Sequence, residues 1–508
     1  MCPARDNLPP SASDFHPQRS GLAILVQGIL YLLVFLIEIA VFAKVRTRNV
    51  RQAALLAGSY VLYFTWGAWF SAVLLASTVM NYLLGEWLRR KPSWPALWVG
   101  ILLNLGLLGG FKYLPELAGN LPFASFQQIS HLVLPLGISF WTFQALSYLF
   151  DLYRSEDLDP TLFEFALYMV FFPVTISGPV CRMTEMLPQF RSENPVRWGG
   201  MERGFSRVAM GVLMMQLAKL LGHGILAGDG ITSGFDHLAH WSGLDAWCLA
   251  FGYGLQLFFD FAGYSHIAIG AASMLGITIP ENFARPFAST SPSIFWTRWH
   301  MSLSFWIRDY IFLPLAMLRR DLWWRSLVLV ISMVAFGLWH RANLLFVLWG
   351  FYHGLLLVLH RQVERVQRAT EWQPPARLWN CLSWTATITL ISLGWIFFRA
   401  PSLTRAGQML SAVVSATSYG SHNLSISLYL LVFALAAGYA AVLLASTALT
   451  RYSDPSETIP PAITAVVSTL ARNRWIWVPP LYALTLLAVL VVNSTQGASS
   501  AQFMYRSF

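Results

Sequence analysis

The sequence predicts an all-α polytopic integral membrane protein, and three observations support this fold class. Hydrophobic residues make up 56% of the 508 residues and charged residues only 11%, whereas about a quarter of a soluble domain is charged. Roughly eleven apolar runs approach the ~20 residues that a transmembrane helix needs. Aromatic residues make up 15%, as expected for belts at the two membrane interfaces. Because lipid offers the backbone no hydrogen-bond partner, we expect about eleven transmembrane helices, with re-entrant or interfacial helices between them.

The first apolar run, residues 21–43, is interpreted as a retained transmembrane helix. It is longer than the core of a signal peptide and lacks the basic region that precedes such a core. Lys44, Arg46, Arg48 and Arg51 follow it with no acidic residue among them. Since basic loops stay in the cytoplasm, we expect this loop there and the N-terminus outside.

A second basic cluster, residues 89–91, agrees with that orientation. The apolar stretch between the clusters, residues 53–88, is long enough for a tight pair of helices that returns the chain to the same side. Further segments are expected near residues 96–110, 131–150, 163–176, 205–226, 247–276, 326–339, 342–359, 379–398, 426–445 and 475–492. Several of these are short, so they outnumber the full spans. Because the segment 247–276 contains Asp260 and His266, we expect either one broken helix or two short ones there. We predict an extracytoplasmic tail over residues 1–20 and a single membrane domain over residues 21–508, since no internal repeat or long soluble stretch is found.

The charge pattern and the cysteines exclude several classes of function. The net charge is +10, but the basic residues form short clusters between apolar runs, which indicates cytoplasmic loops rather than nucleic-acid binding. The four cysteines (Cys2, Cys181, Cys248 and Cys381) are scattered, with no CxxC pair and no metal-ligand spacing. We therefore expect no metal, no bound cofactor and no nucleic-acid partner.

His340 follows a short apolar run. Residues 326–339 would form a helix of about 21 Å, against a hydrocarbon core of ~30 Å. A helix that starts at one interface would therefore leave His340 within the thickness of the bilayer. An ionisable side chain there marks a functional site by default, and burial keeps an imidazole neutral, as a general base requires. The alternative is a His-Arg turn between two helices at the membrane surface.

His300 lies in an aromatic stretch, residues 295–315, which also carries Arg298, Arg308 and Asp309. These charges are too many for a span that faces lipid. On a helical projection, Arg298 and Asp309 fall within about 20° of each other and His300 points the opposite way. This pattern predicts an interfacial or re-entrant helix beside a water-filled cavity. The alternative is an ordinary amphipathic surface helix with an incidental histidine.

Short motifs occur in a fixed order along the chain. They are LPLGISF at 134–140, FFP at 171–173, SGP at 177–179, FDFAGYS at 259–265, ENF at 281–283, WIFFRA at 395–400 and the aromatic ending at 502–508. Together with the windows around His300 and His340, they resemble the membrane-bound O-acyltransferase (MBOAT) family, in its bacterial alginate and polysaccharide O-acetyltransferase branch. The resemblance covers roughly residues 50–410 and the C-terminus. Each motif is short, and their order and spacing make the resemblance specific.

The resemblance implies a set of site residues. His340 would be the general base, and His300 a second catalytic residue. Candidates for substrate binding or support of the site are Arg298, Trp299, Arg308, Asp309, Trp339, Arg341, Asp260 and Asn282. The alternative for Asp260 is a buried carboxylate hydrogen-bonded to neighbouring helices. We expect His353 to be structural, because it lies about 140° from His340 if one helix carries both.

Two positions depart from the pattern of the branch. After residues 263–265 the branch usually carries an acidic residue, and this chain has His266. The loop after His340 usually begins with a small residue, and this chain has Arg341. A permanent cation beside the proposed base would disfavour its protonation or attract an anionic donor.

The implied reaction is acyl transfer. A thioester, either acetyl-CoA or an acylated carrier protein, would enter from the cytoplasm, and an acceptor hydroxyl would approach from the other side. His340 would take the hydroxyl proton, and His300, Arg298 or a backbone amide would stabilise the oxyanion. The resemblance also implies the inner membrane of a bacterium and a separate extracytoplasmic SGNH-type acetyltransferase that modifies a polysaccharide.

Two other functions are compatible with the sequence. A transporter or flippase would use the polar intramembrane residues for translocation alone, although the paired repeats common in transporters are not found. An O-acyltransferase could also act on a lipid or a secreted protein. The motif at 134–140 and the aromatic C-terminus favour a polysaccharide acceptor.

Overall fold

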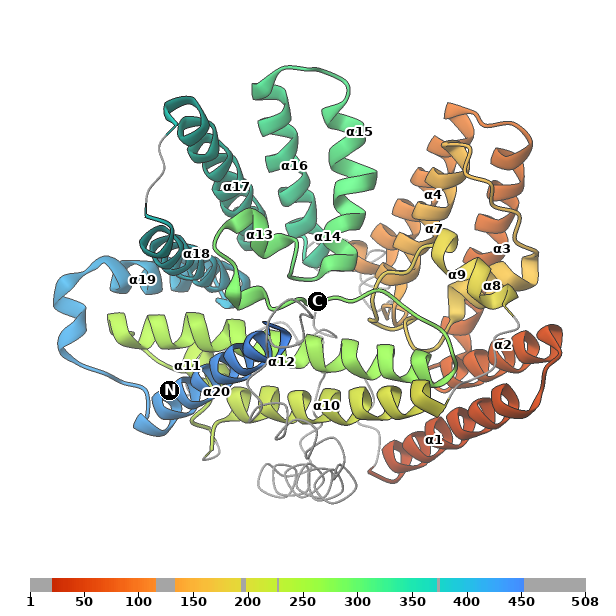
Figure 1. Ribbon diagram of the computed structural model, residues 1–508, viewed down its shortest axis with the longest axis horizontal. Coiled ribbons are helices and arrows are strands. Elements are labelled where there is room, and N and C mark those ends of the chain that lie inside the picture. The colour runs from red at the N-terminus through yellow and green to blue at the C-terminus, as the bar shows by residue number, and fades with distance from the viewer. Residues whose placement is uncertain (1–20, 116–132, 193–197, 226–227, 372–374, 452–508) are drawn as a thin grey trace, which may run out of the picture. The chain divides into compact units, whose positions relative to one another are not determined.

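The part of the chain that the structure describes is built of helices joined by turns and short extended segments. The computed structural model describes residues 21–115, 133–192, 198–225, 228–371 and 375–451 (Figure 1). The chain divides into two compact units, unit 1 with residues 1–202 and 272–279, and unit 2 with residues 203–271 and 280–508. The expected tail over residues 1–20 and the expected span at 475–492 lie outside the described residues, and the single membrane domain stays a prediction.

Unit 1 is built around a buried helix. Its helices are α1 (Gly21–Lys44), α2 (Arg48–Phe64), α3 (Ala68–Arg90), α4 (Trp94–Lys112), α7 (Ile138–Tyr153), α8 (Leu162–Val170) and α9 (Met183–Arg191). The expected pair over residues 53–88 is confirmed as α2 and α3. Fourteen of the 16 residues of α7 are buried, and α3 and α4 both pack against it. A buried amide pair, Asn81 and Asn104, joins α3 to α4 with hydrogen bonds of 3.1 and 2.7 Å, which satisfies polar groups that lipid would leave unpaired.

Unit 2 holds the two histidine windows. Its helices are α10 (Trp198–His223) and α12 (Gly243–Met274), both of which reach into unit 1, then α11 (Ile231–Asp236), α13 (Pro292–Trp296), α14 (Met301–Ile307), the π-helix η3 (Arg308–Phe312), α15 (Leu313–Ala316), α16 (Leu322–His340), α17 (Leu344–Thr370), α18 (Ala376–Arg399), α19 (Leu403–Val414) and α20 (Ile426–Arg451). Two short 3₁₀ helices, η2 (Pro286–Ala288) and η4 (Ala416–Gly420), complete it. The segment 247–276, for which one broken helix or two short ones were expected, is the single helix α12.

Helices α16 and α17 form a closely packed hairpin, which is visible in Figure 1 as two adjacent helices. A Cβ atom at Gly337 would lie 2.1 Å from the carbonyl oxygen of Phe346, and one at Gly350 would lie 2.3 Å from that of Met333. Only glycine permits this approach of the two backbones. The hairpin therefore fixes the end of α16, where His340 stands.

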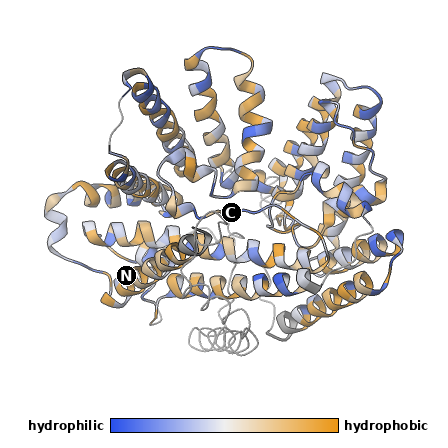
Figure 2. Ribbon diagram, in the orientation of Figure 1, coloured by the Kyte–Doolittle hydropathy of each residue, from blue (hydrophilic) through white to orange (hydrophobic). Residues whose placement is uncertain are grey.

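Eight helices of the described residues are long and apolar enough to cross a membrane. They cover Val26–Lys44, Ala68–Arg90, Trp94–Lys112, Gly199–His223, Leu322–His340, Leu344–Thr370, Ala376–Arg399 and Ile426–Ala445. Hydrophobic residues dominate α1 along its length in Figure 2. The segments expected at 131–150 and 163–176 became α7 and α8, with 16 and 9 residues, which are too short to span the hydrocarbon alone. The count of about eleven spans stays a prediction.

Candidate active site

His340 is the last residue of α16, and a three-residue turn separates it from α17. Asn343 ends that turn, because its side-chain oxygen accepts a hydrogen bond of 3.1 Å from the backbone N–H of Phe346 and so caps α17. The imidazole of His340 is 5% exposed. The alternative was a His-Arg turn at the membrane surface. Arg341 is exposed, as that alternative requires, but His340 is buried.

His300 stands where the helical path breaks. Its backbone is left-handed, with φ 43° and ψ 52°, and α14 begins at the next residue. No single helix therefore runs from α13 to α14. The helical projection that placed Arg298 and Asp309 on one face assumed such a helix and is wrong. A left-handed conformation is uncommon for a residue other than glycine and requires support from its surroundings.

Asn282 supplies that support. Its backbone oxygen accepts a hydrogen bond from Met301 N at 2.9 Å, and its side-chain oxygen accepts one from the hydroxyl of Ser302 at 2.6 Å. Its amide nitrogen donates to Ser265 Oγ on α12 at 3.0 Å. Asn282 therefore connects α12 to the first turn of α14 and fixes the backbone beside His300.

The two histidines share one cavity. Its volume is about 10 Å³, which suffices for roughly one water molecule. The lining residues are Leu257, Phe261, Trp296, Trp299, His300, Phe336, His340, Trp349, Trp395 and Phe398. They come from α12, α13, the segment before α14, α16, α17 and α18, all within unit 2. Windows that are 40 residues apart in sequence thus meet at one small, almost wholly apolar site.

Aromatic rings hold both imidazoles in place. The His340 ring stacks on Phe336, with ring centroids 5.3 Å apart and planes 22° apart, and the edge of Phe398 lies 4.9 Å away. The His300 ring meets Phe261 edge-on at 4.5 Å and lies 6.4 Å from the same Phe336 ring. Phe336 is thus an aromatic neighbour of both histidines.

The site contains buried hydrogen-bond donors that have no acceptor among the described residues. Burial lowers the pKa of His300 to about 3, so the imidazole is neutral at physiological pH. The indole nitrogens of Trp296, Trp349 and Trp395 are buried and have no hydrogen-bond acceptor among the described residues. Because an unpaired buried donor costs about 1–3 kcal/mol, each of these N–H groups would be stabilised by an acceptor such as a water or substrate oxygen.

Most of the other expected site residues lie outside the cavity lining. Arg298 donates to the carbonyl of Ala288 at 3.4 Å, and Arg308 forms an ion pair with the adjacent Asp309 at 2.6 Å. Trp339 is buried and lies against the His340 ring at 4.6 Å. Of the supporting candidates, the structure brings only Trp299 into the cavity with the two histidines.

Two polar residues of α12, Asp260 and His266, lie outside the cavity lining. Asp260 is buried in α12 and interacts electrostatically with Lys219 of α10, and both roles considered for it stay predictions. His266, where an acidic residue is usual, lies in the field of an ion pair between Arg207 and Glu281, whose charged atoms are 2.6 Å apart. The carboxylate of Glu281 therefore acts on position 266, although residue 266 itself is not acidic.

His353 is fully buried on α17, against Trp349 and Trp296 at 4.9 and 5.3 Å. His340 and His353 lie on two different helices, α16 and α17, so the angle calculated for one continuous helix does not apply. His353 nevertheless lies outside the cavity lining, and its structural role stays a prediction.

Several residues of the cavity wall were not anticipated from the sequence as site residues. They are Leu257, Phe261, Trp296, Phe336, Trp349, Trp395 and Phe398. Apolar and aromatic residues in membrane helices are too common to single out by type. A signal was available, because Trp349 lies just before His353 and Trp395 and Phe398 belong to the motif at 395–400.

Comparisons with known proteins identify the family of the chain. The model of the membrane-bound O-acyltransferase family matches residues 125–399, a range that contains both histidines and every residue of the cavity wall. The chain is also similar to a probable alginate O-acetylase, AlgI, of Pseudomonas aeruginosa. The two are 34% identical over 391 residues, which cover 74% of this chain and 71% of the relative.

Two further relatives extend the similarity. A probable alginate O-acetylase, AlgI, of Azotobacter vinelandii is 31% identical over 495 residues, covering 90% of this chain and 95% of the relative. A peptidoglycan O-acetyltransferase of Helicobacter pylori is 30% identical over 408 residues, covering 73% of this chain and 75% of the relative. Both similarities extend over nearly three quarters of the chain or more.

Proposed function

The chain belongs to the membrane-bound O-acyltransferase family, in its alginate and polysaccharide O-acetyltransferase branch, and we propose that it passes an acetyl group from a thioester to a polysaccharide. It is a multi-pass membrane O-acyltransferase. The observation that carries the proposal is the single small cavity lined by His300 and His340. The names of the relatives, which act on alginate or peptidoglycan, support a polysaccharide as the final acceptor.

His340 is the general base of the proposed reaction. It lies at the carboxyl end of α16, where the helix dipole favours the imidazolium that forms when the ring accepts the proton of the attacking hydroxyl. The alkoxide oxygen forms a bond to the thioester carbonyl carbon, the carbon–sulfur bond breaks, and the thiolate takes the proton from the imidazolium.

His300 and the indole N–H groups stabilise the oxyanion. A neutral imidazole donates one hydrogen bond without carrying charge, and burial keeps His300 in this form. Trp296 and Trp349 line the same cavity, and their indole nitrogens have no acceptor among the described residues, which supports them as further donors. Arg298, which the sequence offered as another donor, does not line the cavity and donates to the carbonyl of Ala288, so the proposal uses His300 and the indoles.

The donor, the direction and the partner are parts of the same proposal. The donor is acetyl-CoA or an acylated carrier protein that enters from the cytoplasm, and a separate extracytoplasmic SGNH-type acetyltransferase receives the acyl group. The location is the bacterial inner membrane, with the N-terminus outside. The basic residues at the end of α1 and just after it, beginning with Lys44, support this orientation.

The test uses purified protein, its SGNH-type partner and acetyl-CoA labelled in the acetyl group. We expect His340→Ala to lower label transfer by about 10²–10⁴-fold, the usual contribution of a general base. His353→Ala is the matched control, because His353 is equally buried in the same unit but does not line the cavity. Near-normal transfer by His340→Ala would contradict its role as base.

A second arm separates acyl transfer from transport. His300→Ala should lower turnover more than it weakens donor binding, because an oxyanion donor acts in the transition state. His300→Gln keeps a donor and should retain part of the activity. If the parent protein transfers no label but carries an intact solute across a vesicle membrane, the chain is a transporter. Label on a lipid or a secreted protein would instead identify a different acceptor.

A further inference from the structure

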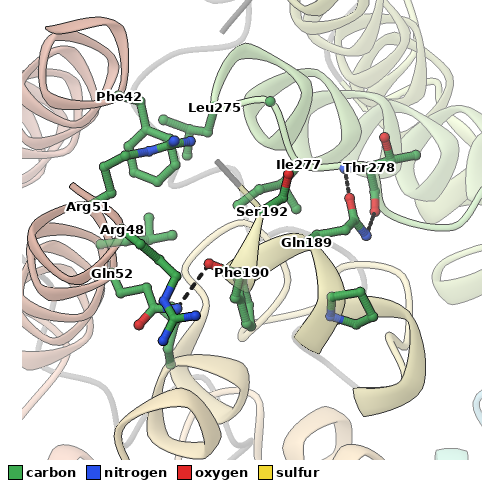
Figure 3. Close-up of a pocket in the computed structure, with 14 residues that line it drawn as sticks. Phe42, Arg48, Arg51, Gln52, Gln189, Phe190, Ser192, Leu275, Ile277 and Thr278 are labelled. Atoms are coloured by element: carbon green, nitrogen blue, oxygen red, sulfur yellow. Dashed lines mark hydrogen bonds between the residues drawn. The ribbon is translucent and has the colours of Figure 1, made fainter. Parts of the chain in front are cut away.

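Unit 1 contains a second cavity, which is far larger than the histidine site and has no part in the proposed reaction. Its volume is about 330 Å³, at the lower end of the roughly 300–1,000 Å³ of small-molecule sites. The lining residues are Phe42, Arg48, Arg51, Gln52, Leu55, Leu167, Pro188, Gln189, Phe190, Ser192, Leu275, Gly276, Ile277 and Thr278. All of them belong to unit 1, and Figure 3 shows their arrangement.

The cavity wall is fixed by polar contacts between three segments. Gln52 of α2 donates to the carbonyl of Phe190 at the end of α9, at 2.9 Å. Gln189 of α9 accepts from Thr278 N at 2.7 Å and donates to Thr278 O at 2.9 Å. These hydrogen bonds appear as dashed lines in Figure 3. The cavity is therefore a built feature in which α2, α9 and the segment after α12 are tied together.

The charge of the lining is one-sided. Arg48 and Arg51 lie one turn apart on α2 and occupy the side of the cavity opposite Ile277 and Thr278 (Figure 3). No aspartate or glutamate is among the 14 lining residues. Arg51 is only 8% exposed, and its guanidinium carbon lies 4.5 Å from the centre of the Phe42 ring. Two arginines in a lining that contains no carboxylate favour an anionic ligand.

The rest of the lining indicates an amphiphile. Half of the lining residues, among them Leu55, Leu167 and Leu275, are apolar side chains, which a small inorganic anion would leave without contacts. Phe42 belongs to the last turns of α1, whose apolar span ends at Lys44. Lipid headgroups lie at the ends of membrane spans, and basic pockets there bind anionic headgroups.

We propose that this cavity binds the phosphate headgroup of an anionic phospholipid. Arg48 and Arg51 would pair with the phosphate, and the apolar wall would contact the glycerol and the first part of the acyl chains. The volume suits a headgroup rather than a whole lipid. The proposal does not depend on the acyl-transfer function, because it concerns different residues in a different unit.

The test measures lipid binding to the purified full chain in neutral detergent, by native mass spectrometry. Phosphatidylglycerol, phosphatidylcholine and glycerol 3-phosphate are titrated separately. We expect the parent to prefer phosphatidylglycerol. Arg48→Gln should weaken that binding by about fivefold, since a basic residue near a headgroup contributes about that factor. Arg46→Gln is the matched control, because Arg46 is an exposed arginine in the turn just before α2 and does not line the cavity.

A double variant, Arg48→Gln with Arg51→Gln, should abolish the preference for phosphatidylglycerol. Because Arg51 also packs on Phe42, the thermal midpoint of each variant is measured together with its affinity, to detect a loss of stability. Arg48 is exposed, so the single variant Arg48→Gln does not disturb the interior. Equal binding of the two lipids by the parent, or equal losses in Arg48→Gln and Arg46→Gln, would overturn the proposal. Equal affinity for glycerol 3-phosphate would overturn the lipid as ligand.

Discussion

The hydroxyl of Ser302 donates a hydrogen bond of 2.6 Å to the side-chain oxygen of Asn282. This contact, with the one from Met301 N to the Asn282 carbonyl, joins the first turn of α14 to the segment that follows α12. His300 lies directly before that turn in a left-handed conformation, which few residue types adopt without support. Asn282 therefore acts through the backbone of His300, as a positioning residue.

The first prediction follows from this contact. Asn282→Ala should lower kcat by about 10- to 100-fold with a smaller change in KM, because a catalytic group displaced by about 1 Å loses that much. Ser302→Ala should have a milder effect in the same direction, and Ser302→Thr, which keeps the hydroxyl, should restore most of the activity. Steady-state acyl transfer measures all three.

The control is another buried asparagine. Asn104→Ala removes the partner of Asn81 in unit 1 and should lower thermal stability without the loss of kcat. If Asn104→Ala and Asn282→Ala lower kcat equally at matched amounts of folded protein, Asn282 has only a structural role.

Much of the helical framework could be predicted from the sequence, because apolar runs of membrane length leave the backbone few alternatives. The pair α2 and α3 and the position of His340 at a helix end follow from such runs. The single helix α12 did not, since Asp260 and His266 indicated a break. Both side chains find electrostatic partners on other elements, and no local pattern reveals those partners.

The interior of the site was harder to predict than its two histidines. The break at His300 depends on Asn282, which lies 18 residues earlier, and a helical projection cannot include such a tertiary contact. The cavity walls come from α12, α13, the segment before α14, α16, α17 and α18, and their tryptophans resemble any others in the sequence. Position in space, rather than residue type, makes Trp349 and Trp395 part of the site.

The second prediction concerns the hairpin that carries His340. Gly337→Ala should lower both the folded yield and the activity, because the new Cβ atom would lie 2.1 Å from the Phe346 carbonyl oxygen and force the helices apart. Gly407→Ala is the matched control in α19, where a Cβ atom meets nothing within 4 Å, and it should be neutral. Size-exclusion profiles and thermal midpoints in detergent measure the effect. A Gly337→Ala protein as stable as the parent would contradict the close packing of α16 and α17.

The third prediction tests the orientation in the membrane. With Cys2 removed, a cysteine introduced at Ser13 should react with a membrane-impermeant thiol reagent in intact cells, and one at Asn49 should react only after the cells are opened. Asn49 lies in the first turn of α2, between Arg48 and Arg51, and basic residues favour the cytoplasmic side. The reverse labelling pattern would show that the N-terminus is inside.

The fourth prediction uses the burial of His300, which lies outside the eight apolar helices. Its pKa is lowered from 6.5 to about 3 in the folded protein because the ring is removed from water. Below pH 6.5 the unfolded chain therefore binds a proton at this residue that the folded chain does not. By linkage, His300 lowers the free energy of unfolding as the pH falls from about 6.5 towards 3, by up to about 1.4 kcal/mol per pH unit.

His300→Asn removes the titrating group and keeps a side chain that tolerates the left-handed backbone. The thermal midpoint of this variant should therefore fall less steeply than that of the parent between pH 7 and pH 5, whatever its value at neutral pH. His422→Asn, a change at an exposed histidine, should leave the slope unchanged. Parallel curves for the parent and His300→Asn would mean that His300 is already accessible to protons in the folded state, and that the site between α14 and α16 is wetter than its 10 Å³ cavity implies.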